Sequence, residues 1–372
     1  MRAASLASVL LLVFLSSASA QALRDLRLAF VGDIMAHNVN TRMSDYQDIY
    51  RGVADIFHGC DLVAANLEFP IDSTRPTSGY PLFNGDPAYV RAAVESGIQV
   101  FSVANNHAFD AGEEGVFQTL RAFAALSGAA SRALTFSGIR GNQHRPFLPE
   151  TRLVNGVRVG FLAVTQFLNE PDAGRYVNVV DYSDDRAVQD LLQLVRSVSP
   201  LYGLFIVSYH GDREYAQEPS PLKRAFFQEL LEAGAHIVFS HHPHVVQRYE
   251  VVRVKGVERL IMYSMGNFIS GMTWMLGPAH LRGAVAATGE SYILMVDVRC
   301  AAGGCSVRGV EPIPIANYMN ERNEMVVARM SDLAEGTIVL SPGWQEYFAG
   351  RLALMESFLG VAASPDQPVD RE

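Results

Sequence analysis

Short apolar runs that recur along the chain constrain its fold more than any other feature of the sequence. Each run has the length and composition of a buried strand, and segments with helical spacing separate several of them. The runs are LRLAFVG, DLVAANLE, IQVFSVANN, VRVGFLAVT, YGLFIVSYH, HIVFSHHPH and RLIMYSMGN, and the helical segments are 86–97, 113–128, 185–198 and 222–234. Strands that alternate with helices predict an α/β protein, with antiparallel strands added near residues 285–313.

Nearly every predicted strand ends in a side chain that can bind a metal ion. In chain order these side chains are Asp33, Asn66, Glu68, Asn105, Asn106, His107, His210, His241, His242, His244 and Asn267, with Asp110 one turn after His107. The carboxyl ends of the strands form one edge of an open α/β sheet, so these residues should converge. Carboxylates, imidazoles and amide oxygens together make a mixed nitrogen and oxygen site for divalent metals. We therefore expect a metal site at that edge.

The stretch IVFSHHPHVVQ gives this prediction its strongest support, because it holds three of the chain's ten histidines within four positions. Alternate residues of a strand face the same way, so we expect His242 and His244 to reach one site, with Pro243 stiffening the turn between them. Taken singly, the other polar residues at strand ends have simpler interpretations as helix caps, turn residues or hydrogen-bonded core residues.

The net charge limits the binding partners of the chain, and the N-terminal residues indicate its location. A formal net charge of −9 argues against non-specific binding to nucleic acid or to an anionic membrane surface. Arg2 precedes the apolar run LASVLLLVFL, and Ala18 and Ala20 form an A-x-A cleavage site. We expect residues 1–20 to be a signal peptide that is cleaved near Ala20–Gln21. The remaining chain would be secreted or periplasmic, with no transmembrane anchor.

The cysteines and the C-terminal residues predict the remaining organisation. Cys300 and Cys305 lie between two β-like stretches, where an oxidising compartment favours a disulfide that closes the hairpin. Cys60 is expected to be a small buried residue. We predict one domain over residues 21–320, and a helical extension with a frayed tail over residues 321–372. The apolar stripe that should dock the extension on the domain comprises Trp344, Phe348, Leu352, Met355 and Leu359.

Six motifs carry a resemblance to a known family. FVGDIM, LVAANLEFPI, VANNHAFDAGEEGV, IVSYHGDREY, SHHPHVVQ and YSMGNF resemble, in order, the motif series of the CapA family. This is a bacterial capsule-synthesis group associated with poly-γ-glutamate. The resemblance covers about residues 26–268, and no motif from residue 269 onward matches. It implies a fold of the calcineurin-like metallophosphoesterase type, which is a four-layered α/β/β/α sandwich.

The resemblance also implies a set of metal ligands and the one or two divalent ions (Mn, Fe, Zn or Ca) that they hold. The matching positions are Asp33, Glu68, Asn106, His107, His210, His242 and His244. Two positions depart from the pattern. Metallophosphoesterases begin with D-x-H, but position 35 is Met, which leaves His37 as a conceivable substitute. The tryptophan and glycine that follow the isolated histidine are replaced here by Gly211 and Asp212, and Arg213 comes next.

The leading interpretation is a secreted metal-dependent hydrolase or transferase that acts on an anionic envelope polymer or peptide, with capsule synthesis machinery as a partner. His107, His210 and Asp110 are the candidate catalytic groups. Arg213 and Asn267 are the candidate substrate-binding groups. Two alternatives remain open: a metal-assisted peptide epimerase, and a non-enzymatic accessory protein for capsule export or assembly.

Overall fold

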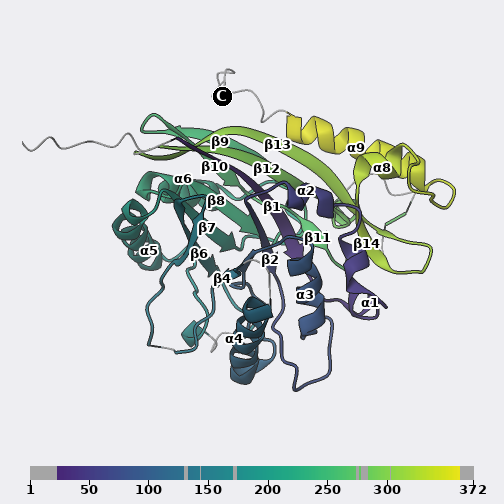
Figure 1. Cartoon of the computed structure of the whole chain (residues 1–372), viewed down its shortest axis with the longest axis horizontal. Helices are drawn as coiled ribbons and strands as arrows, with labels where there is room; N and C mark the ends of the chain where they lie inside the picture. The colour runs from purple at the N-terminus through teal and green to yellow at the C-terminus, as the bar shows by residue number, and fades with distance from the viewer. Residues whose placement is uncertain are drawn as a thin grey trace, which may run out of the picture.

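The computed structural model describes residues 23–129, 133–142, 144–170, 174–273, 276–277, 284–301 and 303–360. The predicted signal peptide and the tail from residue 361 lie outside the described residues. Two β-sheets form the centre of the molecule (Figure 1). The strands of the larger sheet are β1 (Arg24–Ile34), β2 (Leu62–Leu67), β3 (Val100–Ser102), β4 (Thr135–Ser137), β11 (Asn267–Ile269), β12 (Glu290–Ala301), β13 (Gly304–Met319) and β14 (Met325–Arg329). Those of the smaller sheet are β5 (Glu150–Val154), β6 (Val157–Thr165), β7 (Leu204–His210), β8 (Ile237–His241), β9 (Tyr249–Val254) and β10 (Val257–Met262).

Parallel strands form the middle of both sheets. The order in the larger sheet is β14-β13-β12-β1-β2-β3-β4, with β11 also paired to β1, and the order in the smaller sheet is β5-β6-β7-β8-β10-β9. The pairs from β1 to β4 are parallel, as are those joining β6, β7, β8 and β10. β12, β13 and β14 are antiparallel additions. All seven predicted strand runs therefore form strands, and the expected antiparallel region is confirmed.

Three of the helices begin where the sequence provides a side-chain cap. The helices are α1 (Asn38–Thr41), α2 (Ala54–His58), α3 (Pro87–Glu95), α4 (Gly112–Ala129), α5 (Asp185–Val198), α6 (Pro221–Ala233), α7 (Ala284–Ala287), α8 (Met330–Ala334) and α9 (Trp344–Gly360). The side chains of Asp86, Asp184 and Ser220 accept hydrogen bonds from the first turns of α3, α5 and α6. No helix in the described ranges has the length and apolarity needed to cross a membrane.

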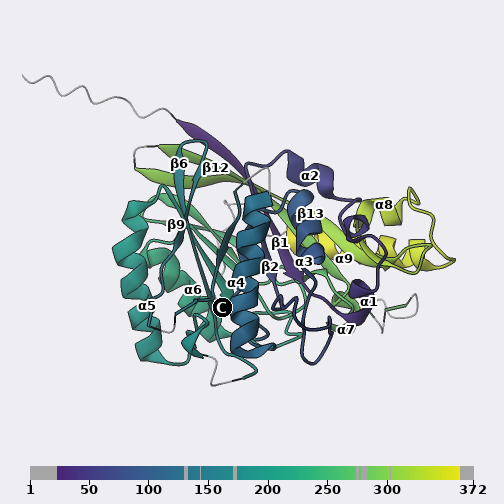
Figure 2. The same ribbon diagram turned by 60° about the horizontal axis from the view of Figure 1, so that its bottom comes forward.

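Three apolar cores stack the elements into four layers. The alternating residues of β1 show why: Phe30 faces the smaller sheet, where its ring lies 5.1 Å from that of Phe239, while Ala29 and Val31 face the opposite core. That second core lies between the larger sheet and α2, α3 and α4. Figure 2 shows α3 and α4 over β1 and β2. The third core lies between the smaller sheet and α5 and α6. The chain thus has the α/β class and the α/β/β/α layering expected from the sequence.

The C-terminal segment extends the larger sheet before it becomes helical. β14 pairs with β13, so the boundary expected at residue 320 falls inside the sheet. α9 then docks along the edge of the core between the sheets, at the opposite end of the molecule from α5 (Figure 1). Phe348, Met355 and Leu359 are buried there, and Trp344 and Leu352 pack beside them. The predicted apolar stripe of this helix is confirmed.

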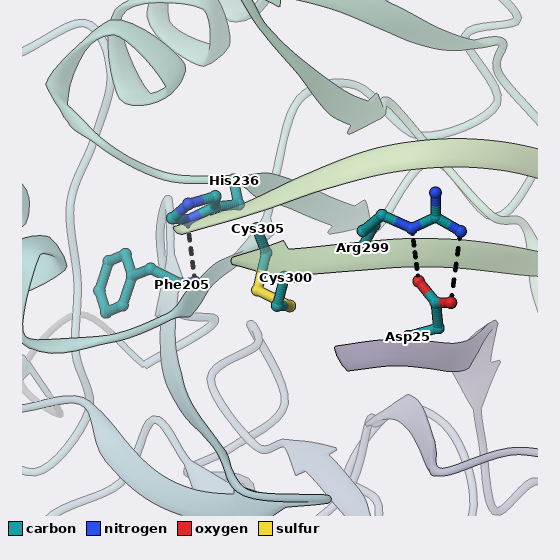
Figure 3. Close-up of a disulfide and its surroundings, with 6 residues drawn as sticks. All are labelled: Asp25, Phe205, His236, Arg299, Cys300 and Cys305. Carbon is teal, nitrogen blue, oxygen red and sulfur yellow. Dashed lines mark hydrogen bonds and ion pairs between the residues drawn. A yellow bond between two sulfur atoms is a disulfide. The ribbon is translucent and has the colours of Figure 1, made fainter. Parts of the chain in front are cut away.

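The hairpin of β12 and β13 ends in a disulfide. Cys300, near the end of β12, is bonded to Cys305, near the start of β13, as predicted (Figure 3). Beside it, the Arg299 guanidinium donates a hydrogen bond to the Asp25 carboxylate at 2.8 Å, which links β12 to the start of β1. Cys60 is a free, buried thiol, in agreement with the prediction.

Candidate metal centre

Three neighbouring strands bring Asp33, Asn66 and Asn267 together. Asp33 pairs in register with Asn66 of β2 on one side and with Asn267 of β11 on the other. The close crossing of β1 and the segment before β11 requires glycine, because a Cβ on Gly32 would lie 1.9 Å from the Gly266 carbonyl oxygen. At this crossing the Asp33 N–H donates to the Gly266 carbonyl at 3.0 Å. The local chain path thus fixes the Asp33 carboxylate at the edge of the larger sheet.

Four atoms with lone pairs meet around His210, at the carboxyl end of β7. Its Nε2 lies 2.7 Å from Asn106 Oδ1, 3.1 Å from His242 Nδ1 and 3.5 Å from Glu68 Oε1. Of these four atoms, Glu68 Oε1 makes no hydrogen bond with the described residues. Such a group of converging lone pairs is the arrangement expected of a metal-binding site.

A second group forms around His244. Its Nδ1 lies 2.9 Å from Asn267 Oδ1 and 3.4 Å from Asp33 Oδ2, and its Nε2 lies 3.7 Å from Glu68 Oε1. Burial alone would raise the pKa of Asp33, but the interactions with His244, His241 and Asn66 outweigh it and lower that pKa. Burial would likewise lower the pKa of His244, but Asp33 raises it. Glu68 lies between the two groups and contacts both.

Several buried polar atoms at this edge lack a partner. Asp33 Oδ2, Glu68 Oε1 and His241 Nδ1 make no hydrogen bond with the described residues. Ligand atoms of Asp33, His210 and His241 lie within 4.8 Å of one another, and so do those of Glu68, His242 and His244. Buried polar atoms without partners are rare and costly. A divalent cation would satisfy them, so the donor set fits a metal.

The protonation of these groups also suits a metal. Burial lowers the pKa values of His210 and His242 far below the usual value, with further lowering from neighbouring imidazoles. Burial lowers the pKa of His241 to about 4. These imidazoles are therefore neutral at neutral pH, which is the form that binds metals. Burial, reinforced by repulsion from Asp33, raises the pKa of Glu68 well above its usual value. A cation beside Glu68 would stabilise its ionised form.

His107 and Asp110 form a separate pair next to the cluster. His107 Nδ1 lies 2.7 Å from Asp110 Oδ2, which also accepts the Phe83 N–H at 2.8 Å. Because an ionised carboxylate can only accept, Nδ1 is the donor in this contact, and Asn169 Nδ2 lies 3.2 Å from the same nitrogen. His107 belongs to neither of the two groups around Glu68. Its own contacts therefore resemble those of a proton-transfer group.

Two sequence expectations, on strand alternation and on His37, have a different outcome in the structure, whereas the substrate-binding role of Arg213 stays a prediction. β8 ends at His241, and both His242 (φ 97°) and His244 (φ 58°) have left-handed backbone. Strand alternation is therefore the wrong reason for their convergence, although they do converge. Arg213 is exposed and makes no side-chain hydrogen bond or ion pair with the described residues. His37 Nδ1 accepts the Gly271 N–H at 3.1 Å, so its Nε2 carries the proton and offers no lone pair.

Two residues outside the ligand set that the resemblance implies, His241 and Asn169, also surround the site. His241 shares a face of β8 with Phe239, and its ring lies 4.3 Å from the Phe239 ring. Period-two alternation along β8 predicts that this face points inward, so His241 could have been included. Asn169 Oδ1 accepts a hydrogen bond from Asn106 Nδ2 at 3.3 Å. It lies in the connection after β6, where no sequence pattern marks it.

Comparisons with known proteins agree with this arrangement of motifs. Residues 27–272, more than half of the chain, match the family of bacterial capsule synthesis proteins PGA_cap. Capsule biosynthesis protein CapA of Bacillus anthracis is 29% identical over 264 residues, which cover 67% of this chain and 61% of that protein. PGA biosynthesis protein CapA of Bacillus subtilis strain 168 is 25% identical over 255 residues, covering 67% and 64%. The chain therefore spans less than two thirds of the length of these relatives.

Among solved structures, the fold is similar to a phosphatase from Mycoplasma pneumoniae, with a TM-score of 0.48 and 13% identity over 79% of this chain and 95% of that one. A protein from Thermus thermophilus has a TM-score of 0.43 and 18% identity over 78% and 98%. By the extent of the family match, the chain belongs to the bacterial capsule synthesis protein family PGA_cap.

Proposed function

We propose that this protein is a metal-dependent hydrolase or transferase that acts on a polymer of the bacterial capsule or envelope. The observation that carries this proposal is the buried convergence of Asp33, Glu68, His210, His242 and His244, in which one oxygen of each carboxylate makes no hydrogen bond with the described residues. Burying carboxylates in this way destabilises the folded protein unless a cation binds there. One or two divalent ions fit its nitrogen and oxygen donors, and the imidazole nitrogens favour Mn, Fe or Zn over Ca.

The residues of the site have separable roles. Divalent ions in such sites act as Lewis acids and make water a stronger nucleophile at neutral pH. His107 stands beside the cluster with Nδ1 held by Asp110, which leaves Nε2 to take a proton from a nucleophile or give one to a leaving group. Asn169 holds the side chain of Asn106, whose oxygen faces His210. His107 is accordingly assigned to proton transfer, with Asp110 orienting its ring.

An anionic polymer is the proposed substrate. The relatives are named for capsule and PGA biosynthesis, and their names supply the capsule context. Arg213 lies on the loop directly after β7, exposed and without an intramolecular partner for its side chain in the described chain. An arginine in that condition can form two parallel hydrogen bonds with a carboxylate or phosphate of the substrate. Proteins of the capsule synthesis machinery are the proposed partners.

We also propose that the protein acts outside the cytoplasm. The predicted signal peptide over residues 1–20 and the disulfide between Cys300 and Cys305 support this location, because such bonds persist in oxidising compartments. Cell fractionation followed by N-terminal sequencing tests it. We expect the mature chain to begin near Gln21, and recovery of the intact chain from the cytoplasm alone would contradict it.

The decisive experiment is the metal content of the mature protein, measured by elemental analysis after reconstitution. We expect one or two ions per chain, lost in Asp33→Ala and in His242→Ala. Asp25→Ala is a matched control, because Asp25 lies on the same strand but is exposed and pairs with Arg299. A wild-type protein without metal, or variants that retain all of it, would reject the proposal. Phosphodiesters and γ-glutamyl amides are then assayed with wild type and His107→Ala, which should keep its metal and lose turnover.

A further inference from the structure

A fully buried lysine, Lys223, contacts the chain segments next to the candidate metal ligands, and it has no role in the chemistry proposed above. Lys223 is in the first turn of α6 and has no exposed surface. Its Nζ donates to the Tyr263 carbonyl at 2.7 Å, to the Gly211 carbonyl at 3.3 Å and to Gln247 Oε1 at 3.5 Å. An ammonium has three N–H donors, so these three contacts use all of them.

All three acceptors are neutral, which is unusual for a buried cation. No carboxylate of the described residues lies within ion-pairing distance of Lys223, and the nearest acidic charges that act on it are those of Asp212 and Asp33. Burial lowers the pKa of Lys223 to about 7. The first turn of a helix also repels a positive charge. Burying a lysine without an acidic partner destabilises the fold, so a specific role is needed to explain this side chain.

The three acceptors belong to the three segments that carry the histidines and Asn267. Gly211 directly follows His210 at the end of β7. Gln247 follows the segment with His242 and His244, and its own N–H donates to the Ser264 carbonyl at 3.0 Å. Tyr263 follows β10 and begins the turn that leads to β11. The segment with His242 and His244 has no strand pairing of its own, because both residues lie beyond the end of β8. His210 and Asn267, by contrast, are the last residue of β7 and the first residue of β11.

We propose that Lys223 is the positioning residue of the metal centre, joining the three chain segments that follow His210, follow His242 and His244, and precede Asn267. This inference rests on the proposed metal-binding function. The ammonium sets the spacing of the segments through backbone and amide oxygens, and so it fixes the ligand atoms before a metal arrives. Partners outside the ligand set that orient ligands in this way typically change metal affinity by 10- to 100-fold when removed.

Lys223→Met tests this role, because Met keeps the length of the side chain and removes the donors and the charge. Titration with Mn²⁺ followed by calorimetry should give a Kd about 10- to 100-fold higher than that of wild type. The direction of the change is diagnostic. A lysine that acted on the site only as a nearby positive charge would repel the ion, and its removal would lower the Kd. Arg224→Met is the matched control, since Arg224 is the next residue of α6 and pairs at the surface with Glu218 and Glu250.

Hydrogen exchange of the metal-free proteins tests positioning without any metal. Lys223→Met should exchange faster than wild type over residues 209–216, 241–247 and 262–268, and like wild type over β1 and β2. Unchanged exchange with an unchanged or lower Kd overturns the proposal. A wild type that binds no Mn²⁺ rejects the proposed function alone, because the exchange result still decides whether Lys223 joins the segments. If Lys223→Met does not fold, Lys223→Gln, which retains two neutral N–H donors, takes its place in both measurements.

Discussion

Replacing Glu68 with glutamine should stabilise the metal-free protein and destroy the metal centre. Glu68 is fully buried, its Oε1 has no hydrogen-bond partner among the described residues, and its Oε2 receives only the Asn66 amide at 3.4 Å. No lysine or arginine forms an ion pair with it in the described part of the chain. The acidic side chain of Asp33 repels it further. In the absence of a cation, this carboxylate therefore lowers the free energy of unfolding.

The size of the effect follows from the contacts. A buried polar group left without a partner costs about 1–3 kcal/mol, and a charged group more. A glutamine carboxamide has the same shape as the Glu68 carboxylate without the charge, so Glu68→Gln should raise the free energy of unfolding of the metal-free protein by about 1–3 kcal/mol. A metal at 100 times its Kd stabilises the protein that binds it by about 2.7 kcal/mol. Saturating metal should therefore cancel or reverse the difference between wild type and variant.

The difference should also depend on pH in a defined direction. The pKa of Glu68 in the folded protein is raised above its ordinary value of 4.5. An acid with a raised pKa contributes stability that is fully present below the unfolded pKa and is lost as the pH rises through the folded pKa. The advantage of Glu68→Gln in the metal-free protein should thus be small near pH 4.5 and should grow as the pH rises.

Urea unfolding with a chelator, and again with excess Mn²⁺, measures these differences. Glu290→Gln is the matched control, because Glu290 is also buried but accepts hydrogen bonds from Arg351, with Nε to Oε2 at 2.9 Å. Removing one charge of a buried pair costs about 3–5 kcal/mol, so the same substitution there should destabilise the protein. If Glu68→Gln weakens the metal-free fold as Glu290→Gln does, Glu68 has a stabilising partner and our interpretation of its burial is wrong.

Three further substitutions probe the parts that surround the cluster. Asp110→Asn should retain metal but lower turnover by about 10²- to 10⁴-fold, because it weakens the hydrogen bond between His107 Nδ1 and the side chain at position 110 that orients the ring. Elemental analysis and initial rates measure the two effects. Gly32→Ala should destabilise the fold by about 3 kcal/mol and reduce metal content, since its Cβ collides with the Gly266 carbonyl, and urea unfolding beside elemental analysis measures both. Cys305→Ser should cost about 2 kcal/mol by loop entropy, and the loss should disappear when both proteins are compared under reducing conditions.

The sequence predicts the layers of this fold well because buried strands and amphipathic helices are defined by local composition. The runs around Phe30 and Phe239 contain almost no polar residue before their ends, and in the structure both lie in the apolar core between the sheets. Helix starts such as Asp86 and Ser220 carry their caps in the sequence. The meeting of metal-binding residues at one edge then follows from parallel pairing.

The details of the site depend on contacts that no local pattern records. The left-handed backbone at His242 and His244 turns both side chains toward Glu68, although an alternating strand would be the simpler path. The crossing at Gly32 becomes visible only when the distant Gly266 segment is in place. In the sequence, Lys223 is an ordinary cation near the start of a helix. Only the tertiary structure brings its ammonium to Gly211, Gln247 and Tyr263.

A metal ion at the candidate centre would also help to hold the two sheets in register. Asp33 and Glu68 come from the larger sheet, whereas His210, His242 and His244 come from the smaller one. The core between the sheets is apolar, and apolar contacts do not specify direction. A cation bound by ligands from both sheets would impose a direction at one edge of that core. Metal binding and correct sheet packing are then linked equilibria, so a change that shifts the sheets, even far from the cluster, should weaken metal binding as well as stability.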